Sequence, residues 1–95
     1  MSVTHIPLAD CLLQLGIGEA FILTLEERGL THPVREEQSL FIDEYELIRL
    51  EKMVRMYTEL EINIEGIETI MHLLDRVEQM QQEIQSLRNR LRLYE

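Results

Sequence analysis

The last third of the chain has the most restrictive pattern in the sequence. From Ile70 to Tyr94, apolar residues recur at alternating spacings of three and four without a miss. These are the spacings of the a and d positions of a coiled coil, and they predict a long helix whose apolar seam needs a partner helix. The simplest partner is the same helix of a second chain, so we expect a homodimer. The predicted dimerisation residues are Ile70, Leu73, Val77, Met80, Ile84, Leu87, Leu91 and Tyr94.

The charges beside this seam bear on the orientation of the two helices. With Ile70 at position a, Glu83 and Arg90 fall at g, and Arg88 and Glu95 fall at e. In a parallel pair, Glu83 would face Arg88 of the other chain and Arg90 would face its Glu95, both attractive. Two surface pairs contribute little energy, so the orientation stays open.

The long helix has a predicted start and a domain boundary in front of it. Asn63 is a good N-cap for a helix beginning near Ile64. We therefore predict a globular unit over residues 1–62 and a dimerisation helix over 63–95, together forming one structural domain. At 95 residues the chain is short enough that its core gains from oligomerisation.

The first part of the globular unit reads as two short helices around a glycine turn. Apolar residues at i, i+3, i+4 and i+7 predict a helix over about residues 7 to 15, which Gly16 ends. A second helix is predicted from about residue 18 or 19 to Arg28, with Gly29 as its C-cap. We expect Met1 to His5 to be a frayed terminus ahead of these helices.

A small hairpin and a third helix follow. Residues 34–36 and 39–42 predict two short strands around a turn at Glu37 and Gln38, which form a wing. Asp43 and Glu46 fit a capping box at the start of a helix that runs to about Leu60. Arg49 belongs to the charged side of this helix, which we expect to be solvated.

The second helix has the position of a DNA-reading helix but not its chemistry. Such a helix carries cations and amides toward phosphates and base edges. Here Arg28 is its only cation, and the net charge of the chain is -9. An acidic surface repels nucleic acid, so we expect a protein partner with a basic face.

The expected partner surface combines acids with apolar groups on the second helix, the wing and the start of the third helix. Residues 19–46 contain eight acidic residues and only two arginines. Exposed Phe21 and Leu23 suggest docking, although a later helix covering them is an equally good interpretation. The predicted partner-binding residues are Glu19, Phe21, Leu23, Glu26, Glu27, Glu36, Glu37 and Glu44.

Catalytic and metal-binding patterns are absent from the sequence. His5, His32 and His72 are scattered without metal-ligand spacing, and the lone Cys11 reads as a small buried hydrophobe. We therefore expect no enzyme activity, no cofactor and no metal. No apolar run approaches the length of a membrane span, and no signal peptide is visible, which makes the cytoplasm the expected location.

The order of these elements resembles two related protein families. Helix, glycine turn, helix, wing, capped helix and long terminal helix resemble the MerR-type winged helix-turn-helix, a mainly α fold with a β-hairpin wing and a C-terminal coiled-coil helix. The chain is also similar to the chaperone-modulator (CbpM-like) family. This second resemblance is carried by Leu8, Asp10, Gly16, Ile17, Gly29, Pro33, Phe41, Asp43, Glu59, Leu60, Gly66, Ile67, Leu87, Arg88, Arg90 and Leu91.

The chaperone-modulator resemblance implies an adaptor that binds the J-domain of a DnaJ-like (CbpA-type) co-chaperone. Such an adaptor restrains the stimulation of an Hsp70 ATPase and reduces DNA binding by the co-chaperone. The alternative is a MerR-type transcription regulator that would contact DNA through Arg28, Arg35 and Arg49. MerR-type regulators tend to pair their terminal helices antiparallel, which disagrees with the charges beside the seam.

Overall fold

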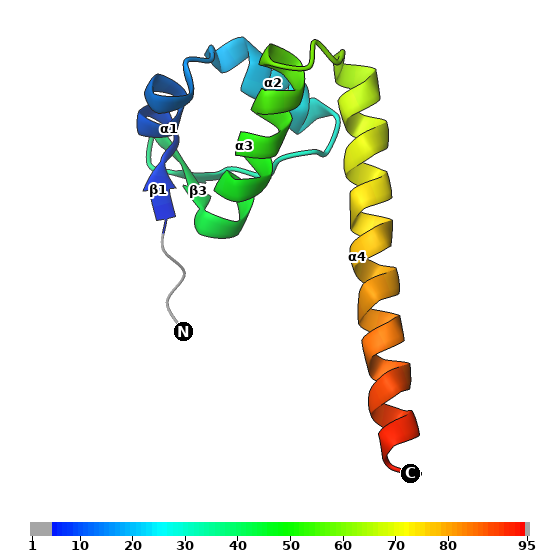
Figure 1. Cartoon of the computed structure of the whole chain (residues 1–95). Helices are drawn as coiled ribbons and strands as arrows, with labels where there is room; N and C mark the ends of the chain where they lie inside the picture. The colour runs from blue at the N-terminus through cyan, green and yellow to red at the C-terminus, as the bar shows by residue number, and fades with distance from the viewer. Residues whose placement is uncertain (1–4, 95) are drawn as a thin grey trace.

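The computed structural model describes residues 5–94, which form four helices and three short strands. The first three helices and the sheet gather on one side, and the last helix stands beside them as a long rod (Figure 1). This arrangement confirms the predicted mainly α fold with a wing and a long C-terminal helix. In chain order the elements are β1 (His5–Pro7), α1 (Leu8–Leu15), α2 (Glu19–Glu27), β2 (Val34–Glu36), β3 (Ser39–Asp43), α3 (Glu44–Thr58) and α4 (Ile64–Arg92).

Glycines end the first two helices, as predicted. Gly16 has a φ of 69°, and its N–H donates to the carbonyl of Leu12 at 2.9 Å. Gly29 follows α2 with a φ of 72°. Left-handed backbone of this kind favours glycine because it has no Cβ to clash. These two residues therefore set the length of α1 and α2 and the angle at which the chain leaves each helix.

The sheet has one strand more than the sequence predicted. The predicted hairpin is present as β2 and β3, and β1 pairs antiparallel with the other side of β3, giving the order β1-β3-β2. Within β1, His5 pairs with Asp43 and Ile6 pairs with Ile42. The expectation of a frayed terminus over residues 1–5 is thus wrong for His5. Residues 1–4 lie outside the described part of the chain. Pro7 is tolerated because β1 is an edge strand.

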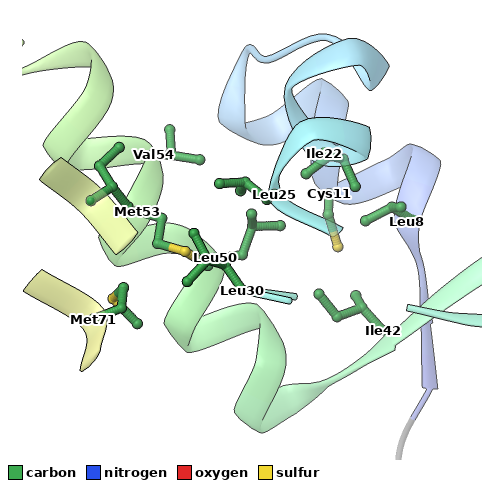
Figure 2. Close-up of a cluster of buried hydrophobic side chains, with 11 residues drawn as sticks. Leu8, Cys11, Ile22, Leu25, Leu30, Ile42, Leu50, Met53, Val54 and Met71 are labelled. Carbon is green, nitrogen blue, oxygen red and sulfur yellow. The ribbon is translucent and has the colours of Figure 1, made fainter. Parts of the chain in front are cut away.

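The core lies where α1, α2, α3, β3 and the start of α4 meet (Figure 2). Ile22 and Leu25 of α2, Leu50 of α3 and Ile67 of α4 are at most 1% exposed. Cys11 is buried among them, as expected, and burial raises the pKa of its thiol. The first turns of α4 therefore pack in the globular unit, and the rest of α4 extends beyond it.

Side-chain caps begin the two long helices at the predicted residues. Asp43 Oδ1 accepts a hydrogen bond from the N–H of Glu46 at 2.7 Å, and Asn63 Oδ1 accepts from the N–H of Gly66 at 2.8 Å. A Cβ on Gly66 would lie 2.7 Å from Cγ2 of Ile62, so a larger residue there would force the side chain of Ile62 to shift. Both helices thus start where local chemistry satisfies their free N–H groups.

Among the described residues, no single helix is both long and apolar enough to cross a membrane. The helices α1 and α2 pass that test only as a pair bent by 113°, and Leu8, Cys11, Ile22 and Leu25 of this pair are core residues.

Candidate functional site

The outward side of α2 carries four of the eight predicted partner-binding residues. Glu19, Leu23, Glu26 and Glu27 recur at helical spacing on one side of the helix. Leu23 is 42% exposed, and Glu19 and Glu27 are also exposed. We call these four residues the acidic face of α2. This face has the position of a DNA-reading surface but offers carboxylates and one leucine.

Phe21 points to a different side of α2. Its ring packs against the ring of Tyr57 in α3, with centroids 4.8 Å apart and planes tilted by 47°. Phe21 is therefore half-buried while Leu23 is exposed. The sequence allowed two interpretations of these apolar residues. Phe21 is partly covered by a later helix, α3, whereas Leu23 is exposed.

The remaining three predicted partner-binding residues lie on the wing and beside it. Glu36 and Glu37 are at the hairpin turn, where the φ of Glu37 is 57°. Glu44 begins α3 at the other end of the five-residue strand β3, about 16 Å away at the usual rise per residue. All three are exposed. The predicted acidic surface therefore extends over two ends of the wing as well as α2.

An ion pair joins α3 to α4. Arg49 Nη1 donates to Asp75 Oδ1 at 2.7 Å, and Nη2 donates to Oδ2 at 3.3 Å. The hydrogen bond to Asp75 raises the pKa of Arg49, and the same bond lowers the pKa of Asp75. The guanidinium also lies 5.8 Å from the ring centroid of Tyr45. The expectation that Arg49 is a solvated charge is wrong, because α4 supplies a carboxylate beside it.

A second set of ion pairs joins the end of α2 to α4. Arg28 Nη2 lies 3.0 Å from Glu65 Oε1, and Nη1 lies 3.7 Å from Glu68 Oε1. Arg35 forms no ion pair with any residue between 5 and 94. Two of the three arginines available to the DNA-binding alternative are thus already bound to carboxylates of this chain.

The predicted seam of α4 is uncovered in the single chain. Ile70 is half-buried, and the other seven residues of the seam are between 48% and 88% exposed. All seven come after Met71, the last buried residue of α4, and the C-terminal part of that helix stands clear of the globular unit (Figure 1). An apolar stripe of this length is unusual on the free surface of a protein and is typical of an interface.

The sequence did not predict a hollow at the junction of α2, α3 and α4. Its volume is about 410 Å³, and Ile17, Ala20, Phe21, Tyr57, Thr58 and Ile64 are among its lining residues. We call it the apex hollow. Its residues come from three elements far apart in the chain, so spacing along the sequence gives no signal for it. Phe21 is the one predicted site residue that lines it.

Within residues 5–94, no group of three or more His, Cys, Asp or Glu side chains is arranged to hold a metal ion. The surfaces described above are the acidic face of α2, the apolar seam of α4 and the aromatic pair of Phe21 and Tyr57.

Two helices around a glycine turn, followed by a hairpin wing, define a winged helix-turn-helix protein. The profile described as MerR HTH family regulatory protein matches residues 6–89. The chain belongs to this family of helix-turn-helix regulatory proteins. No curated protein matches the sequence.

Proposed function

We propose that this chain is a non-enzymatic adaptor, located in the cytoplasm, that binds the J-domain of a DnaJ-like (CbpA-type) co-chaperone. By occupying the J-domain it lowers the co-chaperone activity and the DNA binding of that protein. The observation that carries the proposal is the acidic face of α2, where a DNA reader would present cations. The resemblance to chaperone modulators supplies the identity of the partner.

The charge of the chain supports a basic partner. The J-domain surface that meets Hsp70 is basic, and this chain has a net charge of -9. Arg28 and Arg49 are engaged by carboxylates of α4, which lowers the positive potential near α2 and α3 further. Complementary potentials of this kind accelerate association and make it sensitive to salt.

The proposed adaptor is a homodimer formed through α4. Seven half-exposed or fully exposed apolar residues at coiled-coil spacing support this pairing. A second α4 would remove the stripe from water, and each methylene group buried there contributes roughly 0.8 kcal/mol.

A titration of the adaptor with an isolated J-domain tests the proposed function. Isothermal calorimetry is expected to give binding that weakens as the salt concentration rises from low to physiological, because the contact is electrostatic. The control is a J-domain whose basic surface has been reversed to glutamates, which should not bind. An adaptor that fails to bind the unmodified J-domain even at low salt would rule the function out.

The alternative function is DNA binding, with which the MerR family match is compatible. Its contacts would come from Arg28, Arg35 and Arg49. DNA phosphates would have to displace Glu65 from Arg28 and Asp75 from Arg49. A gel shift with promoter DNA at roughly 0.15 M salt is the test. Specific retention with a steep salt dependence would favour this alternative over the adaptor.

A further inference from the structure

A hollow of about 440 Å³ lies between α3 and the middle of α4, and we call it the α3/α4 groove. Four large apolar side chains that line it are exposed: Tyr45 by 58%, Ile48 by 55%, Leu74 by 42% and Val77 by 49%. The apex hollow has one such side chain, Tyr57. Apolar area left in water at four neighbouring positions is typical of an interface.

The α3/α4 groove is continuous with the predicted seam of α4. Val77 is a seam residue, at position a, and it also lines the groove. Leu74 and Gln81 both fall at position e and line the groove too, so this flank of the seam borders α3. The two hydrogen bonds between Arg49 and Asp75 hold α4 to α3 at the same place. The groove is therefore a lateral extension of the seam onto the globular unit.

A helix that packs on the seam also covers the groove. A side chain at position a inserts among four residues of the facing helix. The axes of packed helices are about 8–10 Å apart, and a helix with its side chains is about 10–12 Å wide. A helix that receives the Val77 side chain therefore lies over the groove, whichever way its chain runs. Tyr45 and Ile48, on the α3 wall, come within its reach.

The charges of the groove favour a second copy of this chain over a basic partner. Arg49 and Asp75 neutralise each other, and the two other charged lining residues, Lys52 and Glu78, have opposite signs. A basic helix gains no net attraction from such a site. Residues 70–94 carry three carboxylates and four arginines beside the apolar seam. The terminal helix of this chain thus matches the groove both in its nearly balanced charge and in its apolar stripe.

We propose that α4 of a second copy fills the α3/α4 groove, so that Tyr45 and Ile48 of α3 belong to the dimer interface. The inference rests on the homodimer of the proposed function and adds the globular unit to its interface. In a two-fold symmetric dimer each contact occurs twice, so both grooves are filled together. The interface is therefore wider than the heptad seam, and α3 contributes to the stability of the dimer.

An aspartate on the α3 wall of the groove tests the inference. Ile48 is exposed and is not a core residue, so Ile48→Asp leaves the packing of the globular unit intact. Leu13→Asp is the matched control, because Leu13 is an exposed apolar residue of α1 that does not line the groove. Circular dichroism checks the helical content of both variants. Sedimentation velocity over a concentration series gives the dissociation constant of the dimer.

The expected result is that Ile48→Asp raises this dissociation constant by about tenfold or more, since the dimer would bury two unpaired carboxylates. Leu13→Asp should change it by less than about twofold. An equal effect of the two aspartates would overturn the inference.

Thiol labelling gives a second measurement that needs no disruptive charge. A thiol introduced by Ile48→Cys should react with a maleimide about tenfold or more slowly above the dissociation constant of the dimer than below it, because access controls the rate. The thiol of Leu13→Cys should react equally fast at both concentrations. The natural Cys11 is 3% exposed and adds little to either signal. Equal rates for Ile48→Cys at both concentrations would contradict the inference.

The inference and the proposed function can fail separately. A dimer that Leu87→Asp dissociates and Ile48→Asp leaves intact would refute the filled groove and keep the seam. A chain that is monomeric at every concentration would refute the inference without bearing on the J-domain. Calorimetry with the J-domain completes the comparison. If Ile48→Asp weakens J-domain binding but not the dimer, the groove belongs to that partner. If Ile48→Asp weakens the dimer of a chain that binds no J-domain, the inference stands and the adaptor function fails.

Discussion

Arg49 and Asp75 connect two helices through a pair of hydrogen bonds, 2.7 and 3.3 Å long, although 26 residues separate them in the chain. The pair fixes the middle of α4 against the beginning of α3. It thereby holds α4 to the globular unit one turn beyond its last buried residue, Met71.

Removing the carboxylate of this pair should lower stability in a pH-dependent way. Asp75→Asn is expected to reduce the free energy of unfolding by up to about 1 kcal/mol at neutral pH, because Asp75 is partly exposed. The folded-state pKa of Asp75 is lowered, so its contribution is present above the ordinary carboxyl value, about pH 4, and is lost as the pH falls through the lowered pKa. Urea denaturation at several pH values measures it. Glu78→Gln is the control, and an equal loss there would contradict the prediction.

The cap of α3 should be replaceable by asparagine but not by alanine. Asp43→Ala removes the acceptor for the N–H of Glu46 and is expected to cost about 0.5–2 kcal/mol of stability. Asp43→Asn keeps an acceptor oxygen and should retain most of that stability. Urea denaturation of both variants at one protein concentration makes the comparison. If the two variants are equally destabilised, the hydrogen bond to Glu46 is not the source of the effect.

A charge in the α4 seam should prevent self-association. Leu87 is 57% exposed in the single chain and occupies a predicted seam position. In a dimer, Leu87→Asp would bury an unpaired carboxylate and is expected to give a monomer at micromolar concentration. Leu93→Asp is the matched control, since Leu93 is 82% exposed and lies off the seam. Analytical ultracentrifugation measures the mass, and an unchanged mass for Leu87→Asp would exclude these heptads as the interface.

Reversing charges on the acidic face of α2 should slow association with a basic partner. Glu26→Lys with Glu27→Lys is expected to lower the association rate of the J-domain, with the fold intact, because steering depends on surface charge. Stopped-flow fluorescence gives the rate. The double variant Glu78→Lys with Glu83→Lys makes the same change of net charge on α4. If both double variants slow association equally, only the total charge matters and the α2 face has no special role.

The thiol of Cys11 should be protected in the folded protein. Its side chain is 3% exposed, and burial, with the charge of Asp10 as a smaller cause, raises the pKa of the thiol. A lower thiolate fraction and poor access both slow disulfide exchange. The reaction with Ellman's reagent is expected to be slow in buffer and fast in denaturant. Equal rates in the two conditions would show that Cys11 is accessible without unfolding.

Features that depend on neighbours in sequence were predictable. Gly16 and Gly29, the cap at Asp43 and the cap at Asn63 act within four residues of themselves, and the structure confirms each. The hairpin and the long helix likewise follow from local turn chemistry and from apolar spacing. The predictions on the α4 dimer and on the partner surface stay predictions.

Features that depend on distant contacts were not predictable. The strand β1 is three residues long, too short to show a period of two, and it exists because β3 offers it a free edge. Arg28 reaches Glu65 across 37 residues, and Phe21 meets Tyr57 across a similar interval. Such pairings follow from how the helices pack, and a single sequence carries no spacing that encodes them.

The ion pairs of Arg28 and Arg49 have one consequence for the whole molecule. Both guanidiniums bind carboxylates of the same helix, α4, so this helix acts as a built-in counterion for the globular unit. The position of α4 therefore affects the surface potential around α2 and α3. The long helix neutralises charges of the globular unit as well as packing against its core.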